Sequence, residues 1–200
     1  QVAGQPRHLL GDVAPLGEDG HLPGELVGVD VHVARPRQLV DAVPRIVLTP
    51  LGERGEEHVV AFDEAAYSLG MHGGYEFDTS IMRFGYSSMT TPGRVYDYDM
   101  FTRERTLRKE QEVPSGHDPS AYVVERSFAT ATDGERVPVS ILRKKDTPVD
   151  GSTPALLYGY GSYGHTIPAG FGTGRLSLVD RGFVFAIAHI CGGMERGYRW

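Results

Sequence analysis

The sequence predicts a mixed fold in which an all-β part is followed by the opening of an α/β part. From residue 45 to residue 113, short strand-like runs recur every 10–14 residues, with Gly, Pro and Asp between them. This spacing is typical of antiparallel strands. After a segment rich in Pro at 114–119, two non-alternating apolar runs flank a short helical pattern between residues 155 and 190. That order is typical of a βαβ unit.

The first 42 residues contribute little to the predicted fold. Glycine and proline interrupt them so often that no helix is expected there. One alternating run, Val27–Val33, predicts a strand. The chain begins at Gln1 without a basic-then-apolar leader pattern, and we expect it to be an internal fragment of a longer protein.

The all-β part contains several short strands that turn residues separate. The expected strands cover residues 45–49, 57–62, 80–88, 94–99 and 106–113. We interpret them as one or two blades of a β-propeller, because each blade is a small antiparallel sheet. A β-sandwich has the same sequence pattern and stays an alternative.

A β-hairpin is predicted at the start of the second part. Asp133-Gly134 lies between two alternating runs, 122–130 and 137–143. This dipeptide favours the tight turn that joins two antiparallel strands. The preceding residues 114–119, Pro-Ser-Gly-His-Asp-Pro, carry no periodic apolar position and are expected to form a linker.

The βαβ unit follows the hairpin. Residues 155–160 form an apolar run without alternation, which predicts a strand that is covered on both faces. Residues 175–180 fit one or two helical turns, and Gly182 is suited to the end of that helix. Phe183–Ile190 predicts a second buried strand, and we expect it to pair in parallel with the first.

Composition argues against several classes of partner. The net charge is −6, whereas nucleic-acid and anionic-membrane surfaces select for basic proteins. The most apolar run, Gly182–Ile190, is too short to cross a bilayer. The single cysteine, Cys191, excludes an internal disulfide and is expected to be packed and inert. We therefore expect a cytoplasmic protein that binds neither nucleic acid nor membrane.

No cofactor or metal site is expected. The eight histidines are scattered, and the sequence contains neither His-Glu-x-x-His nor Cys-x-x-Cys. Gly159–Gly164 has the glycine spacing of a dinucleotide-binding loop, but Pro168 and further glycines stand where the helix should begin. His189 is expected to be a hydrogen-bonded core residue. For Glu195 the sequence leaves open a buried ion-pair partner or a solvated loop charge.

The segment with the richest chemistry is Tyr158-Gly-Tyr-Gly-Ser-Tyr-Gly164. It follows the carboxyl end of an expected parallel strand, where open α/β sheets build their sites. Glycine allows the backbone to approach a ligand closely, and tyrosine hydroxyls can donate to a developing oxyanion. From these residues alone, a turn whose rings pack on the sheet is the favoured alternative. The sequence contains no Gly-x-Ser-x-Gly nucleophile elbow.

A resemblance to a known family favours a functional role for this segment over a packed turn. The matching segments are 61–70, 86–92, 95–99, 111–119, 156–164, 175–190 and 192–197. Together they resemble the prolyl oligopeptidase family of serine peptidases, and within it the oligopeptidase B (protease II) branch. The resemblance covers residues 43–200, whereas residues 1–42 are divergent.

The resemblance implies a seven-bladed β-propeller that caps an α/β-hydrolase domain. Residues 1–113 would then form the end of the propeller, 114–119 the linker and 120–200 the beginning of the hydrolase domain. It implies cleavage of short peptides after Arg or Lys by a Ser–Asp–His triad, without a cofactor. All three triad residues are expected beyond Trp200.

Only one member of the family's catalytic set maps onto this chain. By resemblance it is Tyr160, the oxyanion-hole donor. The family usually carries Arg where this chain has Cys191, which removes a cation close to the sheet. We expect the 200-residue chain to be inactive by itself. The alternative to a peptidase fragment is a catalytically dead truncated or pseudogene product.

Overall fold

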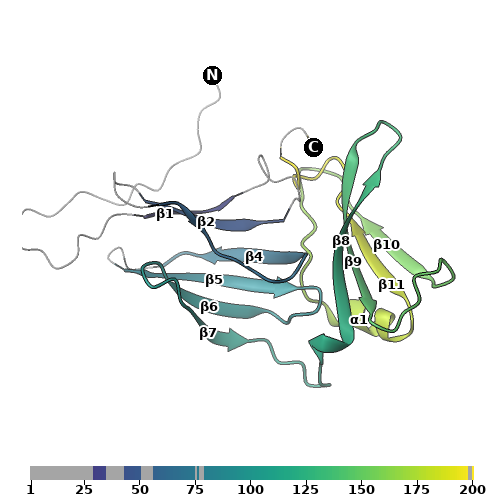
Figure 1. Ribbon diagram of the computed structural model, residues 1–200, viewed down its shortest axis with the longest axis horizontal. Helices are drawn as coiled ribbons and strands as arrows, with labels where there is room; N and C mark the ends of the chain where they lie inside the picture. The colour runs from purple at the N-terminus through teal and green to yellow at the C-terminus, as the bar shows by residue number, and fades with distance from the viewer. Residues whose placement is uncertain (1–28, 35–42, 51–55, 75, 77–78, 198–199) are drawn as a thin grey trace, which may run out of the picture.

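A computed structural model places the chain in three antiparallel or mixed sheets (Figure 1). The residues that it describes are 29–34, 43–50, 56–74, 76, 79–197 and 200. Most of the divergent segment 1–42 lies outside these residues. No helix in the described part of the chain is long and apolar enough to cross a membrane.

The first sheet has three antiparallel strands, β1 (Val29–Ala34), β2 (Arg45–Pro50) and β3 (His58–Val59). β1 and β2 confirm two of the expected strands. β3 is shorter than the expected strand 57–62, because the chain leaves the ladder after the Val60 amide donates to the Ile46 carbonyl at 3.0 Å.

The second sheet is a four-stranded antiparallel meander. Its strands follow one another in space as in sequence, in the order β4 (Tyr67–His72), β5 (Ile81–Ser88), β6 (Arg94–Asp99) and β7 (Arg105–Glu110). This is the arrangement expected of a propeller blade. β4 was not among the expected strands, because Gly70 interrupts its apolar pattern.

Aromatic residues build the core of this blade. Alternate residues of β5, Met82, Phe84 and Tyr86, are buried on one face. Phe62 from the segment before β4 stacks on Tyr86, with ring centroids 4.9 Å apart. Offset stacking of this kind contributes beyond the area it buries. The alternation seen in the sequence therefore fixes which face of the blade is apolar.

A carboxylate on β6 links three strands of the same blade. Asp97 is buried and accepts hydrogen bonds from Arg83 of β5 at 2.6 Å and from Arg108 of β7 at 2.7 Å. The pKa of Asp97 is lowered to about 2, mainly by the hydrogen bond from Arg83 and further by the bond from Arg108. The pair of arginines therefore keeps this carboxylate charged in the folded chain.

Acidification is expected to weaken this blade. Because the pKa of Asp97 is about 2 when folded and 3.8 ordinarily, its contribution to stability is complete above pH 3.8 and is lost as the pH falls to 2. Asp97→Asn should lower the free energy of unfolding by about 1–2 kcal/mol at neutral pH, since solvent screens the exposed arginines. Urea unfolding between pH 7 and pH 2.5 measures this. A wild-type-to-variant difference that stays constant over that range would contradict the assignment.

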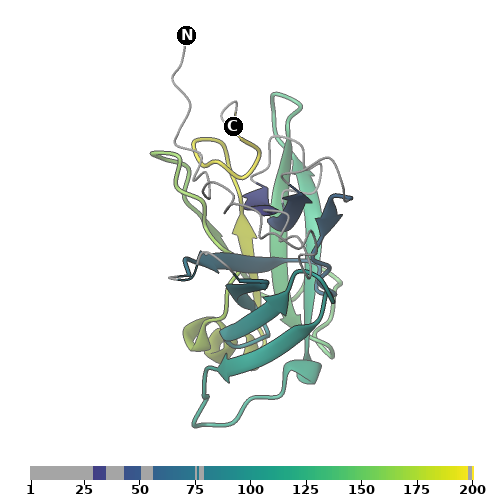
Figure 2. The ribbon, with the colours of Figure 1, turned by 90° about the vertical axis from the view of Figure 1, so that its left-hand side faces the viewer.

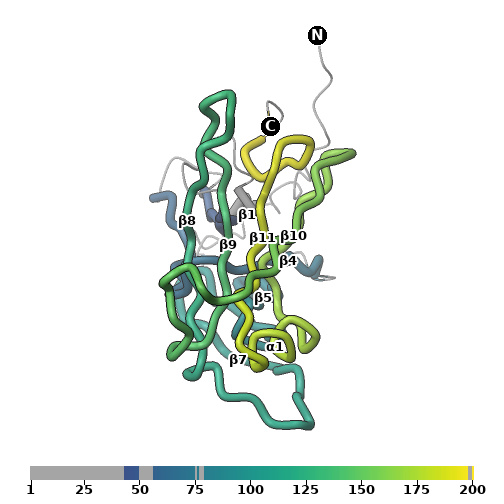
Figure 3. Tube along the Cα trace, turned by 90° about the vertical axis from the view of Figure 1, so that its right-hand side faces the viewer, coloured from purple at the N-terminus to yellow at the C-terminus, as the bar shows by residue number. Residues whose placement is uncertain are grey.

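The third sheet combines a hairpin with a parallel pair. β8 (Tyr122–Thr130) and β9 (Arg136–Lys144) form the hairpin, and the order β10-β11-β9-β8 places β11 (Val184–Ala188) in the interior. β10 (Ala155–Gly159) pairs in parallel with β11, and helix α1 (Thr173–Asp180) connects them. The predicted hairpin and parallel βαβ unit are both confirmed. Figure 3 shows the four strands side by side, with α1 at one end.

One expectation for this sheet is wrong. All five residues of β10 are exposed, Leu157 to 67%, although the apolar run predicted a strand covered on both faces. β10 lies at the edge of the sheet, whereas β11 is paired on both sides. Helix α1 covers β9 and β11 instead, where Leu176 and Val179 pack with Leu142 in the second core cluster. In the described part of the chain, β10 is therefore an apolar edge strand that no other element covers.

The two parts of the chain share contacts beyond the covalent connection. The strands of the blade run across those of the third sheet (Figures 1 and 2). Ala66 and Met89 of the first part belong to the core cluster under α1. The ring of His117, in the expected linker, packs against Tyr122 and Phe171. These packed contacts join the blade to the third sheet around α1.

Candidate active site

Two loops leave the same end of the third sheet, because β10 and β11 are parallel (Figure 3). We call residues 160–167, which follow β10, the tyrosine loop. Residues 190–197, which come after β11, are the glycine loop. The carboxyl ends of neighbouring parallel strands are where open sheets place functional groups.

The two loops pack backbone against backbone. A β-carbon at Gly161 would collide with the Cys191 carbonyl oxygen, and one at Gly192 would collide with the Gly161 carbonyl. Gly192 also has a φ of 92°, in the left-handed region. The Gly164 amide donates to the Gly192 carbonyl at 2.9 Å. Glycine is therefore required on both sides of this contact.

Three tyrosines lie at or beside this contact, and they differ in environment. Tyr158 and Tyr160 are 44% and 40% exposed, whereas Tyr163 is 96% exposed and has a φ of 55°. The Tyr160 ring meets the His165 ring edge-on, with centroids 5.8 Å apart. Among the described residues, the Tyr160 hydroxyl has no hydrogen-bond partner. Its ring is braced while its hydroxyl stays available, and Tyr163 does not pack on the sheet as the alternative required.

A buried polar network supports these loops from the sheet. Ser140 of β9, His189 at the end of β11 and Glu195 of the glycine loop are 0%, 3% and 3% exposed. Ser140 Oγ lies 2.9 Å from His189 Nε2, and His189 Nδ1 lies 3.4 Å from Glu195 Oε1. Arg126 donates to Ser140 Oγ at 2.6 Å, and the Ile167 amide donates to Glu195 Oε1 at 3.1 Å. The network thus connects β8 to the tyrosine loop.

The direction of these bonds fixes the proton positions. Arg126 can only donate, and a carboxylate can only accept. Ser140 therefore donates its proton to His189 Nε2, and His189 donates from Nδ1 to Glu195. Burial lowers the pKa of His189 below its usual value. Burial alone would raise the pKa of Glu195, but the bonds from His189 and from backbone amides outweigh it and hold that pKa below its usual range. At neutral pH the histidine is neutral and Glu195 is charged.

The structure resolves two questions that the sequence raised. His189 is a hydrogen-bonded core residue, as expected, and Glu195 is a buried carboxylate that accepts a hydrogen bond from His189 rather than a solvated loop charge. The part played by Ser140 was missed. The available signal was its position on the inward face of β9, between the buried Pro138 and Leu142, where a polar residue needs a partner.

Cys191 differs from its expectation. It was expected to be packed, but it is a free and exposed cysteine at the start of the glycine loop. Its carbonyl oxygen, rather than its thiol, makes the close approach to Gly161. Among the described residues, no group of three His, Cys, Asp or Glu side chains is arranged to hold a metal ion.

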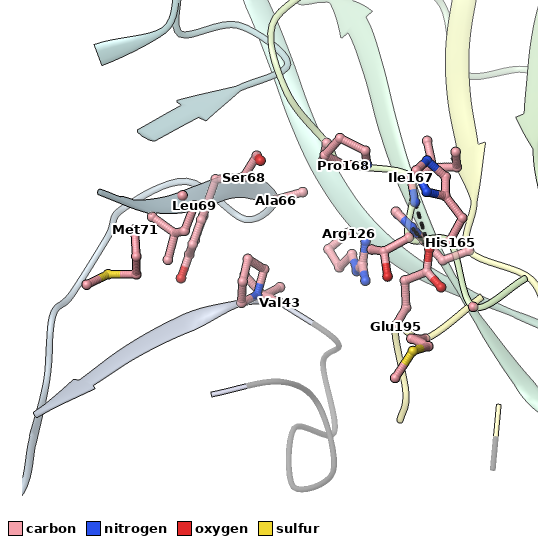
Figure 4. Close-up of a pocket in the computed structure, with 18 residues that line it drawn as sticks. Val43, Ala66, Ser68, Leu69, Met71, Arg126, His165, Ile167, Pro168 and Glu195 are labelled. Atoms are coloured by element: carbon pink, nitrogen blue, oxygen red, sulfur yellow. Dashed lines mark hydrogen bonds and ion pairs between the residues drawn. The ribbon is translucent and has the colours of Figure 1, made fainter. Parts of the chain in front are cut away.

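A cavity of about 730 Å³ lies between the blade and the tyrosine loop (Figure 4). Strand β4 and Val43 line one side, and residues 164–169 line the other. Arg126, His189 and Glu195 contribute polar atoms. The volume lies within the range of small-molecule and peptide-side-chain sites, which is about 300–1,000 Å³. The cavity opens beside the loop that carries Tyr160.

Comparison with known proteins places the first part in a family. Residues 37–111 match the family described as the N-terminal β-propeller domain of prolyl oligopeptidase. This match supports the blade interpretation of β4 to β7 over a β-sandwich.

Curated relatives extend the similarity beyond the blade. The chain is 45% identical over 147 residues to dipeptidyl aminopeptidase BI of Pseudoxanthomonas mexicana, covering 73% of this chain and 20% of that protein. It is 31% identical over 146 residues to protease 2 of Moraxella lacunata, covering 73% and 21%. The chain therefore spans about a fifth of the length of the curated relatives it matches.

Solved structures agree with the sequence relatives. Oligopeptidase B from Trypanosoma brucei, in a closed form with covalently bound antipain, superposes with a TM-score of 0.72 at 34% identity. The superposition covers 88% of this chain and 27% of that one. Oligopeptidase B from Leishmania major gives a TM-score of 0.70, also at 34% identity, over 78% of this chain and 23% of the other.

Proposed function

Because the chain belongs to the prolyl oligopeptidase family of serine oligopeptidases, we propose that it is part of an enzyme that hydrolyses short peptides after Arg or Lys. In this proposal residues 120–200 begin an α/β-hydrolase domain and residues 1–113 end a propeller. The parallel pair of β10 and β11 with α1 between them supports the first assignment. The cytoplasmic location expected from the sequence stays part of the proposal.

One observation carries the proposed role of Tyr160. Tyr160 is 40% exposed and its ring is braced, at the carboxyl end of a parallel strand and on a loop whose residues 164–167 line a cavity. A donor in this position meets negative charge only when a substrate carbonyl becomes tetrahedral. Tyr160 would therefore stabilise the oxyanion, while Ser, His and Asp outside these 200 residues carry out the acyl transfer.

The preference for basic residues is proposed from similarity to oligopeptidase B. Arg and Lys side chains need carboxylates for recognition, because a buried cation without a partner is costly. In the cavity the described residues offer Glu195, but His189 and the Ile167 amide already occupy its Oε1, and its Oε2 is buried out of reach of a ligand. We therefore propose that the acidic residues that select the substrate lie outside this chain.

The second candidate is a catalytically inactive chain, and the Ser140, His189 and Glu195 network bears on it. These residues follow the donor order of a serine hydrolase triad. However, Ser140 is fully buried in the middle of β9, and Arg126 donates to its oxygen. A nucleophile must reach a substrate carbonyl, so this network is structural.

The two candidates separate in a direct assay. The 200-residue chain should match a buffer blank on an Arg-containing fluorogenic dipeptide and should not be labelled at Ser140 by a serine-directed phosphonate. The full-length protein should cleave the same substrate and lose activity with the phosphonate. The proposal would be contradicted by a full-length protein that has an accessible active serine but does not hydrolyse the substrate. Labelling of Ser140 would contradict it as well.

A further inference from the structure

We propose that Glu195 is a positioning residue that acts on Tyr160 through the tyrosine loop. This inference rests on the proposed oxyanion role of Tyr160. It says that the carboxylate of Glu195 anchors the far end of the loop at the Ile167 amide, and that His189 holds the carboxylate in place.

The anchor at Ile167 has two components. The Ile167 amide donates to Glu195 Oε1 at 3.1 Å, and the Ile167 side chain is buried in the core cluster under α1. A loop residue that is fixed by both its backbone and its side chain has few alternative conformations. The segment between Gly161 and Ile167 is therefore held at both ends, since Gly161 is packed against the glycine loop.

The anchored segment contains the residue that contacts Tyr160. His165 lies two positions before Ile167, and its ring meets the Tyr160 ring at 90°. Directly before His165, the Gly164 amide donates to the Gly192 carbonyl. If the Ile167 end were released, His165 would lose its defined place, and Tyr160 would lose the ring that braces it.

The carboxylate of Glu195 is itself tightly restricted. Its Oε2 has no hydrogen-bond partner among the described residues and lies so close to Gly193 that a β-carbon there would collide with it. A buried carboxylate with an unsatisfied oxygen costs stability. The contribution of Glu195 is therefore better explained by the position it imposes than by stability.

A chain of hydrogen bonds behind Glu195 holds its carboxylate in one position. His189 is fixed by Ser140, which in turn is fixed by Arg126. The oxygen that His189 contacts is the same one that accepts from Ile167. Ser140, His189 and Glu195 are buried, so the loss of one of these partners leaves a polar group that needs a new partner or a rearrangement of the loop.

The test uses the full-length enzyme and a double-mutant cycle. Glu195→Ala should lower kcat about 10-fold with KM within about twofold, because it leaves the Ile167 amide without an acceptor. Glu195→Gln keeps an acceptor oxygen and should stay within about threefold of wild type. In a Tyr160→Phe background, Glu195→Ala should cost less than about twofold further, because its effect passes through the Tyr160 hydroxyl.

A matched control comes from the same sheet. Glu125 of β8 forms an ion pair with Arg143 at 2.7 Å, and in the described part of the chain neither side chain is hydrogen-bonded to the tyrosine loop. Glu125→Ala should leave kcat unchanged. If Glu195→Ala yields no folded protein, Gly193→Ala replaces it, because the added β-carbon displaces the same carboxylate.

Amide hydrogen exchange separates this inference from the proposed function. The Ile167 amide should exchange about 10-fold faster in Glu195→Ala than in wild type, whether or not Tyr160 takes part in catalysis. Unchanged exchange would overturn the anchor. Equal losses of kcat in the wild-type and Tyr160→Phe backgrounds would overturn the route through Tyr160. If instead Tyr160→Phe alone leaves kcat intact, the oxyanion role fails while the exchange result still decides the anchor.

Discussion

Tyr160→Phe is expected to lower kcat of the full-length enzyme by about 10²–10³, roughly 3–4 kcal/mol of transition-state stabilisation, with little change in KM. The hydroxyl meets negative charge only in the transition state, so its removal leaves the ground-state complex almost unchanged. Phenylalanine keeps the ring that packs edge-on against His165, so the loop should keep its structure. The measurement is kcat and KM on one Arg-containing substrate.

Two neighbouring tyrosines provide the controls. Tyr158→Phe and Tyr163→Phe change tyrosines that are 44% and 96% exposed, and each should cost well under about 1 kcal/mol. If Tyr160→Phe keeps kcat within threefold of wild type, the oxyanion assignment is wrong. A large loss in Tyr158→Phe instead would move the role by two positions along the loop.

Gly161→Ala is expected to have the second-largest effect. Its β-carbon would overlap the Cys191 carbonyl oxygen and the Ile190 side chain, and the backbone oxygen cannot move aside without separating the loops. Overpacking of this kind costs about 1–3 kcal/mol of stability. Because a displacement of about 1 Å at a catalytic group costs on the order of 10²-fold in rate, kcat should fall by about that factor.

Gly174→Ala is the matched control for this substitution. Gly174 lies in the first turn of α1, and a β-carbon there meets nothing within 4 Å. Alanine in a helix is more stable than glycine by roughly 0.5–1 kcal/mol, so this variant should be slightly stabilised and fully active. Thermal unfolding and kcat of both variants decide the matter. Equal behaviour of the two would show that the close contact between the loops is not required.

The sequence was sufficient for elements whose signal is local. Asp133-Gly134 and the runs on each side of it predicted the β8–β9 hairpin, and the structure pairs Tyr122 with Lys144 through to Thr130 with Arg136. The run 80–88 predicted a strand, and the structure forms β5 there, with alternate residues buried. In both cases the residues that determine the structure lie within one strand and its turn.

The errors arose where neighbours decide the outcome. β10 was expected to be buried because its composition is apolar, but burial depends on which strands and helices lie against it. β3 ends early because the chain leaves the ladder after Val60 donates to Ile46, a residue of β2 that lies 14 positions away. β4 was missed because pairing with β5 overrides the weak pattern around Gly70.

The candidate site was predicted only in part. The sequence pointed to Tyr160 through family resemblance, and it left Glu195 undecided. The network that joins Ser140, His189 and Glu195 spans 55 positions of the chain, so no local pattern reports it. The glycines of both loops were visible as glycines. Only the structure shows that Gly161 and Gly192 must both lack a β-carbon, because the backbones of the two loops lie against each other there.

The most direct test is a crystal structure of the full-length protein with a peptide aldehyde that carries arginine next to the aldehyde carbon. The aldehyde should form a covalent adduct with the active serine, and its oxygen then occupies the position of the oxyanion. We predict that the Tyr160 hydroxyl lies about 2.7–3.1 Å from that oxygen. An adduct oxygen that is held by Tyr158 or Tyr163, or that lies beyond hydrogen-bond reach of the tyrosine loop, would contradict it.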